Sequence, residues 1–333
     1  MIELLKNTQA YRLLQKECAE NTYSHAYLLL FDDGKNLRFA LKEFAKILFS
    51  CEDTENWSKD LQEKQRIAKL IDKDGFSDCL IYPADGKKIS VEDAEKIREE
   101  SLLSPIEGDK KVFIVGDFSE ANVQTQNKLL KLLEEPPKGI VFLLGATTVF
   151  SVLSTVLSRT KKLEILPFDV KDVADALRRI YGEKYDASTL EICAAASGGI
   201  LGEAQNILEG GYYKTLIESA FALCLAEPSK LPAIIRSVGE TKNKKELLSL
   251  LRLIFRDALL VKTDKAACRK SVLLRSEKSR IEEVAQKYTL SALLHAQEEL
   301  SKAELQVQFN AVFPQCIQLC IANIRSGPVI SYD

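Results

Sequence analysis

The sequence predicts an α/β domain built on a parallel sheet, followed by a small helical domain and a C-terminal all-helical bundle. Three observations lead to this prediction. Up to Pro167, short β-rich runs alternate with helical runs, which is typical of a doubly wound parallel sheet. After Pro167 the strand-like runs end. From Tyr212 to Arg325 apolar residues recur every three or four positions, which is typical of a helical bundle.

Continuous apolar runs mark the candidate strands, because strands that are buried on both faces have this pattern. They are residues 27–31, 78–82, 111–116, 140–145 and 162–166. Helices are expected between them, at roughly 35–50, 90–103, 120–135 and 149–158. Ser90 with Asp93 fits a helix N-cap close to a capping box. Pro136 and Pro137 must stop the preceding helix at Glu135.

The helical part of the chain divides at the glycine pair Gly210-Gly211, because such pairs interrupt a helical pattern. The resulting domains are residues 1–167, 168–211 and 212–333.

Composition excludes several classes of protein. Charged residues make up 28% and hydrophobic residues 46% of 333, so the chain is not disordered. A net charge of −2 argues against a dedicated DNA-binding domain. No apolar run reaches the ~18 residues of a membrane span, and the N-terminus lacks a signal-peptide pattern, so we expect a cytoplasmic protein without membrane contact. The 8 cysteines include no CxxC pair, and the 2 histidines lie far apart, so we expect no metal site.

The turn after the first candidate strand is where a phosphate-binding loop of the form GxxxxGK[ST] would lie. Its glycines let backbone N–H groups wrap the phosphates, its Lys reaches the outer phosphates, and its Ser/Thr holds magnesium. The four defining positions are taken here by Phe31, Asn36, Leu37 and Arg38. Gly34 remains inside the loop, and in a second register Lys35 takes the lysine position.

Carboxylates also stand in the wrong places for nucleotide binding. Asp32 and Asp33 lie where a polyanion would have to bind. An ATPase needs an Asp-Glu pair at the end of the third strand, whereas this strand ends in Gly116 and Asp117. Gly116 supplies no metal ligand, and Asp117 is one carbon shorter than a Glu base. We therefore predict that the chain uses no cofactor and neither binds nor hydrolyses ATP.

Several segments resemble the AAA+ subunits of bacterial clamp loaders. Residues 24–28 (SHAYL) look like the segment that precedes the phosphate loop in that family, and residues 126–137 (QNKLLKLLEEPP) closely match its QNALLKxLEEPP helix. The strand 141–145, followed by Thr147 and Thr148, is similar to the family's sensor strand.

A further segment, residues 157–160 (LSRT), matches the LSRC motif of the family, with Thr160 in place of Cys. The resemblance implies that Arg159, with Ser158 beside it, is an arginine finger donated to the ATP site of a neighbouring subunit. The alternative is a surface arginine that pairs with an acid such as Glu164. Glu134 and Glu135 are expected only to fix the end of their helix.

The resemblance also implies subunit contacts and partners. Candidate contact residues are Gln126, Asn127, Lys128, Thr147 and Thr148, although the first three also fit a solvated helix face. The expected partners are the gamma/tau ATPase subunits and the delta subunit, joined through AAA+ modules and a helical collar. The sliding clamp and primed DNA would be contacted by the whole complex.

Two departures from the family matter, one for zinc binding and one for nucleotide sensing. Its small zinc module needs about four ligands, but the aligned positions hold Ser58, Leu61 and Lys64, with Cys51 upstream, so no zinc is expected. Gly202 stands where active relatives place a nucleotide-sensing arginine. The resemblance thus implies a non-hydrolysing ring subunit. Two alternatives stay open: a nucleotide-free AAA+-like adaptor in a non-replicative complex, or a weakly active AAA+ ATPase.

Overall fold

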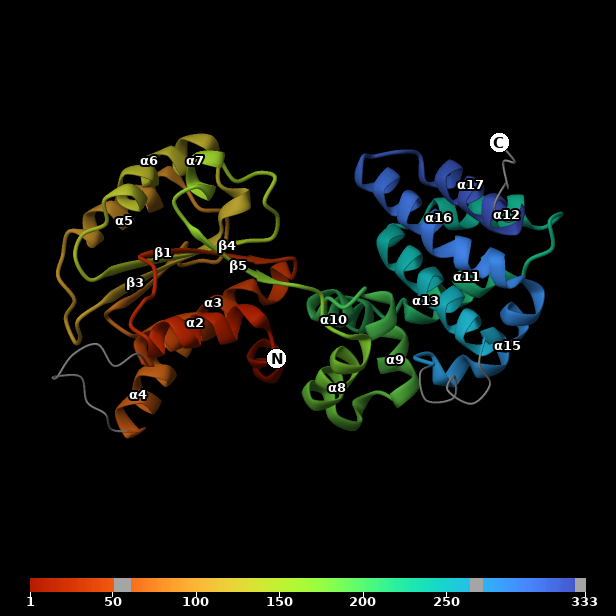
Figure 1. Cartoon of the computed structure of the whole chain (residues 1–333), viewed down its shortest axis with the longest axis horizontal. Coiled ribbons are helices and arrows are strands. Elements are labelled where there is room, and N and C mark those ends of the chain that lie inside the picture. The colour runs from red at the N-terminus through yellow and green to blue at the C-terminus, as the bar shows by residue number, and fades with distance from the viewer. Residues whose placement is uncertain (51–60, 264–271, 327–333) are drawn as a thin grey trace. The chain divides into compact units, whose positions relative to one another are not determined.

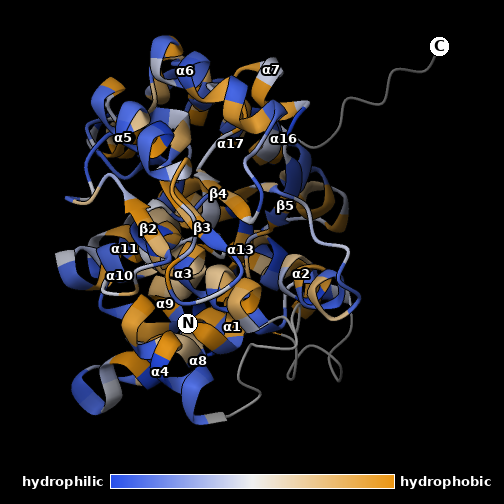
Figure 2. Ribbon diagram, turned by 90° about the vertical axis from the view of Figure 1, so that its left-hand side faces the viewer, coloured by the Kyte–Doolittle hydropathy of each residue, from blue (hydrophilic) through white to orange (hydrophobic). Residues whose placement is uncertain are grey.

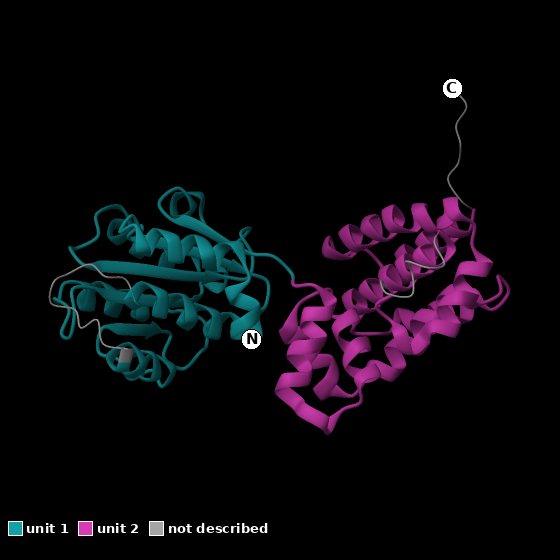
Figure 3. Ribbon diagram, turned by 60° about the horizontal axis from the view of Figure 1, so that its bottom comes forward, with its two compact units in different colours: residues 1–167 teal, residues 168–333 magenta. Residues whose placement is uncertain are grey.

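The computed structural model describes residues 1–50, 61–263 and 272–326. The chain forms two compact units, Met1–Pro167 and Phe168–Asp333, which are coloured separately in Figure 3. The first unit holds a five-stranded sheet of order β2-β3-β4-β1-β5, in which every neighbouring pair of strands is parallel. The AAA+-like α/β fold predicted from the sequence is therefore confirmed.

All five candidate strands are present, and their ends shift by one residue at most. They are β1 (Ala26–Phe31), β2 (Cys79–Tyr82), β3 (Lys111–Asp117), β4 (Ile140–Ala146) and β5 (Lys161–Ile165). The central strands are buried on both faces, which explains why they read as apolar runs. In Figure 2, β3 and β4 are coloured mainly hydrophobic. The carboxyl ends of these parallel strands meet at one edge, where the candidate site lies.

Helices cover both faces of the sheet (Figure 1). Helix α3 packs on β3 and β4, and α2 packs on α3 and β5; on the opposite face α6 contacts α5 and α7. The helices of this unit are α1 (Ile2–Lys6), α2 (Gln9–Ala19), α3 (Gly34–Ser50), α4 (Leu61–Asp72), α5 (Val91–Ser101), the 3₁₀ turn η1 (Phe118–Glu120), α6 (Val123–Glu134) and α7 (Ser154–Leu157).

Local sequence explains most helix ends. Ser90 and Asp93 form the predicted capping box at the start of α5. Glu135 is the C-cap of α6, directly before the two prolines. The helix expected over 149–158 is wrong in extent, because only α7 is helical there. Residues 151–153 are held outside the helix by hydrogen bonds to α6.

The second unit is helical throughout its described part. Its elements are α8 (Val170–Tyr181), η2 (Gly182–Lys184), α9 (Ala187–Ala196), α10 (Leu201–Gly210), α11 (Tyr213–Leu225), α12 (Leu231–Gly239), α13 (Lys244–Thr263), η3 (Arg275–Glu277), α15 (Lys278–Lys287), α16 (Leu290–Gln308) and α17 (Phe313–Ser326). Helix α13 is central and packs against α9, α11, α15 and α16. The further division of this unit at Gly211 stays a prediction. Among the described helices, none is long and apolar enough to span a bilayer.

Candidate functional site

The connection from β1 to α3 consists of two residues, Asp32 and Asp33, because α3 begins at Gly34. Asp33 is only 2% exposed. Its Oδ1 accepts a hydrogen bond from the backbone N–H of Asn36 (3.1 Å), and its Oδ2 accepts one from the Asn36 side chain (2.8 Å). The chain therefore places its own carboxylate at the N-terminus of α3.

This arrangement differs from that of a phosphate-binding loop. A phosphate loop needs a long glycine-rich turn and free N–H groups at the helix N-terminus, where the helix dipole favours an anion. Here the turn is too short to wrap a phosphate, and the Asp33 carboxylate accepts the N–H of Asn36. A phosphate would also be repelled by this negative charge.

Two of the defining positions of the expected loop, Leu37 and Phe31, are buried. Leu37 is 3% exposed. A Cβ atom added to Gly145 of β4 would lie 3.2 Å from Leu37 Cδ1 and 2.7 Å from Leu41 Cδ1, so both leucines pack closely against that glycine. Phe31, in the first glycine position, is buried at the end of β1. Since α3 starts at Gly34, the register with Lys35 in the lysine position matches the helix start better.

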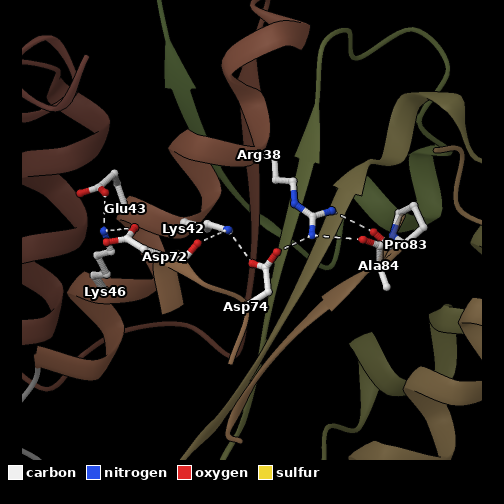
Figure 4. Close-up of polar contacts among 8 residues, drawn as sticks. All are labelled: Arg38, Lys42, Glu43, Lys46, Asp72, Asp74, Pro83 and Ala84. Carbon is white, nitrogen blue, oxygen red and sulfur yellow. Dashed lines mark hydrogen bonds and ion pairs between the residues drawn. The ribbon is translucent and has the colours of Figure 1, made fainter. Parts of the chain in front are cut away.

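Arg38, in the Ser/Thr position of the first register, belongs to a polar network (Figure 4). Its Nη1 donates to the carbonyl of Pro83 (2.9 Å), and its Nη2 donates to the carbonyl of Ala84 (3.4 Å) and to Asp74 Oδ2 (3.1 Å). Arg38 thus joins α3 to the segments that follow α4 and β2, and has a structural role.

The same network continues along α3. Lys42 Nζ lies 2.5 Å from Asp74 Oδ1. Burial alone would raise the pKa of Asp74, but Lys42 and Arg38 hold this pKa below its usual value. Lys46 Nζ lies 2.6 Å from both Asp72 Oδ1 and Glu43 Oε1. Burial alone would lower the pKa of Lys46. The Asp72 and Glu43 carboxylates outweigh this effect, so the pKa of Lys46 is raised.

Asp117, at the end of β3, faces the expected sensor residue Thr147. Its Oδ2 accepts a hydrogen bond from Thr147 Oγ1 (2.7 Å), and its Oδ1 accepts from the backbone N–H of Thr147 (3.2 Å) and of Ser119 (3.1 Å). A Cβ atom added to Gly34 would lie 3.5 Å from Thr147 Cγ2. The structure therefore gathers the start of α3, the metal-strand position and the sensor position at one edge of the sheet.

Gln126 corrects the expectation of an exposed contact residue, because its side chain is buried at 1% exposure. Its Nε2 donates to the carbonyls of Ala121 (3.0 Å) and Ser151 (2.9 Å), and its Oε1 accepts from the backbone N–H of Leu153 (2.9 Å). An amide offers both donors and an acceptor, which is why Gln suits this position. Gln126 fixes the segment that leads into α7.

The other expected contact residues lie nearer the surface. Asn127 is exposed, and Lys128 is half-buried and pairs with Glu95 of α5. Thr148 is half-buried, and its Oγ1 accepts from the backbone N–H of Phe150 (3.3 Å). Phe150 is 96% exposed on the loop between β4 and α7.

Arg159 follows α7 directly and is partly exposed. Its Nη2 lies 2.5 Å from Glu134 Oε1, while its Nη1 donates to the Thr155 carbonyl (2.8 Å) and to Ser158 Oγ (3.1 Å). The expected acid, Glu164, is the wrong partner, because it pairs with Lys162 at 2.8 Å. Sequence reasoning missed Glu134 as an ion-pair partner, since the pair joins residues that are distant in the chain.

The expected absence of a zinc site concerns residues both inside and outside the described part of the chain. Within the described residues, no group of three or more His, Cys, Asp or Glu side chains could hold a metal ion. Cys51 and Ser58 of the expected zinc-module positions lie outside the described residues. Gly202 is buried in the first turn of α10.

Comparison with known proteins bears on the first unit above all. The family model described as DNA polymerase III, delta subunit, matches residues 6–169. The delta' subunit of DNA polymerase III from Bacillus subtilis (strain 168) is 28% identical over 166 residues, which are 50% of this chain and 49% of that protein. The tau subunit from the same strain is 25% identical over 201 residues, or 60% of this chain and 35% of its own length. The chain thus spans half or less of the length of these curated relatives.

Two solved structures align with most of this chain at low similarity. A DNA polymerase III gamma subunit-related protein from Thermotoga maritima is 18% identical with a TM-score of 0.39, and the match covers 96% of this chain and 99% of that one. The Bacillus subtilis clamp loader delta protein is 12% identical with a TM-score of 0.34, covering 95% and 99%. Residues 6–169 match this family model and share sequence with the delta' and tau relatives, so the N-terminal unit of this chain is similar to DNA polymerase III clamp-loader subunits.

Proposed function

We propose that this chain is a delta-prime-type subunit of the DNA polymerase III clamp loader that does not hydrolyse ATP. The observation that carries the proposal is the two-residue turn between β1 and α3, with the Asp33 carboxylate bonded to Asn36 at the helix N-terminus. Subunits that hydrolyse ATP need that place for phosphate and magnesium. In this chain the Asp33 carboxylate lies at that position.

The chain then takes part in ATP chemistry at a neighbour's site. Arg159, supported by Ser158, is the proposed arginine finger, since a guanidinium donated in trans stabilises the charge of a transferring phosphoryl group. Its partial exposure after α7 supports this role. Asn127 and Thr148 are the proposed subunit contacts, because Asn127 is exposed and Thr148 bonds only the backbone N–H of the exposed Phe150. Gln126 is buried, and Lys128 and Thr147 pair with other side chains of the chain.

The partners follow from the family. The proposed neighbours are gamma/tau subunits with complete phosphate loops, and a delta subunit completes the ring. Residues 168–211 would form the lid of the AAA+ module, and residues 212–333 would join a helical collar. The complex would load the sliding clamp onto primed DNA in the cytoplasm, with this chain as scaffold and arginine donor.

The test uses the reconstituted complex of this chain with gamma/tau and delta subunits. Arg159→Ala is expected to leave assembly intact and to lower ATP turnover at the adjoining site by at least about tenfold, as for other arginine fingers. Arg159→Lys keeps the charge but loses the planar fork, so it should restore little activity. Unchanged turnover in the Ala variant would refute the arginine role. Micromolar ATP binding by the isolated chain in calorimetry would refute the nucleotide-free site.

A further inference from the structure

The guanidinium of Arg159 is held within its own chain from two sides. Glu134, the last residue of α6, contacts Nη2 at 2.5 Å, while Thr155 and Ser158 accept hydrogen bonds from Nη1. The Arg159 side chain is 32% exposed and that of Glu134 is 47% exposed. The ion pair therefore lies at the surface, where an approaching partner can reach it.

We propose that Glu134 is a positioning residue for Arg159, which holds the guanidinium in the free chain and competes for it with the phosphate of the neighbouring ATP site. This inference rests on the proposed function of Arg159. A guanidinium presents its N–H groups in a planar fork that fits a carboxylate and a phosphate equally. The N–H of Nη2 that bonds Glu134 must leave it to bond a phosphate.

The exposure of the Glu134–Arg159 ion pair favours transfer of the guanidinium to the phosphate over a permanent pairing. A partly exposed ion pair is screened by water and shifts an equilibrium by no more than about fivefold. A phosphate brings more negative charge, and a docked neighbour would exclude water from the contact. The backbone beside Glu134 is held, because the carbonyl of the preceding Leu133 lies 3.0 Å from His25 Nε2. The exchange can therefore proceed by movement of the Arg159 side chain without a change at the end of α6.

Steady-state ATPase assays of the reconstituted complex test this inference. Glu134→Gln removes the charge and keeps the shape, so kcat/KM for ATP should rise about two- to fivefold. Glu164→Gln is the matched control, because Glu164 is similarly exposed (45%) and pairs with Lys162 at 2.8 Å. It should leave kcat/KM unchanged. An unchanged melting temperature of each variant chain shows that it is folded.

A double-mutant cycle distinguishes failure of this inference from failure of the proposed arginine-finger function of Arg159. In the Arg159→Ala background, Glu134→Gln should change nothing, since its partner is absent. If Arg159→Ala alone leaves turnover unchanged, the arginine-finger function fails. If Arg159→Ala lowers turnover but Glu134→Gln leaves kcat/KM unchanged or reduces it, the competition is overturned. An equal effect of Glu134→Gln in both backgrounds would also overturn it.

Discussion

Asp33 and Asn36 are joined twice, by a bond from the Asn36 backbone N–H to Oδ1 at 3.1 Å and by one from its side-chain amide to Oδ2 at 2.8 Å. The first bond adds a side-chain acceptor for the Asn36 N–H, which also bonds the Asp33 carbonyl (3.1 Å) at the helix N-terminus. The second fixes the orientation of the carboxylate. Together they turn a position that binds phosphate in related folds into a helix cap.

Removing that cap should destabilise the fold. Asp33→Ala is expected to lower the free energy of unfolding by about 1 kcal/mol, the usual effect of losing an N-cap side chain. Urea denaturation followed by circular dichroism measures it. Asp169→Ala is the control, because Asp169 precedes α8 without a side-chain capping bond. Its effect should stay within about 0.5 kcal/mol. Equal losses in the two variants would argue against a capping role.

Arg38 should matter for stability and not for nucleotide binding. Arg38→Ala removes a charged donor to the carbonyls of Pro83 and Ala84 and to Asp74, so we expect a loss of roughly 1–2 kcal/mol in the free energy of unfolding. Arg98→Ala, at an exposed position of α5, should cost less than about 0.5 kcal/mol. A loss no larger than that of the control would show that the network of Figure 4 contributes little.

Gln126 should prove structural. Gln126→Leu removes three hydrogen bonds and leaves the Leu153 N–H and the Ser151 carbonyl without this partner. Buried groups left without partners cost about 1–3 kcal/mol, and we expect a loss of that size in thermal or urea unfolding. The neighbouring, exposed Asn127→Ala should be nearly neutral. A neutral Gln126→Leu variant would contradict the assigned role.

Asp257 should make stability depend on pH. It is fully buried in α13, and burial raises its pKa above 3.8, although the N–H groups of Leu274 and Leu273 oppose this. A raised pKa contributes stability at low pH that is lost as pH rises through the folded-state pKa. Relative to Asp257→Asn, the wild-type chain should therefore become less stable as pH rises from about 4.

Asp186 serves as a control, because its pKa is shifted in the opposite direction and the expected pH dependence of stability is therefore reversed. Hydrogen bonds from Ser188 and Thr189 lower its pKa to about 2. Relative to Asp186→Asn, the wild-type chain should lose stability as pH falls from about 4 towards 2. Urea titrations across this range compare the two variants. The same slope for both would contradict the assignment for Asp257.

The fold could be predicted because its signals are local. Strands buried on both faces need continuous apolar runs, and Ser90 with Asp93 specifies a helix start within four residues. The meeting of Asp117 and Thr147 has a simple cause, since the carboxyl ends of neighbouring parallel strands share an edge.

The rest depends on contacts that the sequence does not display. Gln126 reads as a surface residue near the start of a helix, yet it holds residues 151–153, which shortens α7. The partner of Arg159 lies 25 residues upstream at Glu134 and not nearby at Glu164. Such long-range pairings follow from tertiary packing, which local patterns do not encode.

The short turn between β1 and α3 makes the loss of the phosphate site hard to reverse. Lysine at position 37 would bury an ammonium group against Gly145, and glycine at position 31 would leave a cavity at the end of β1. Single substitutions therefore do not restore the loop, because each new side chain would disturb the packing around Gly145 or β1. Building a phosphate loop here would require a change of the backbone after Phe31 as well as of these side chains.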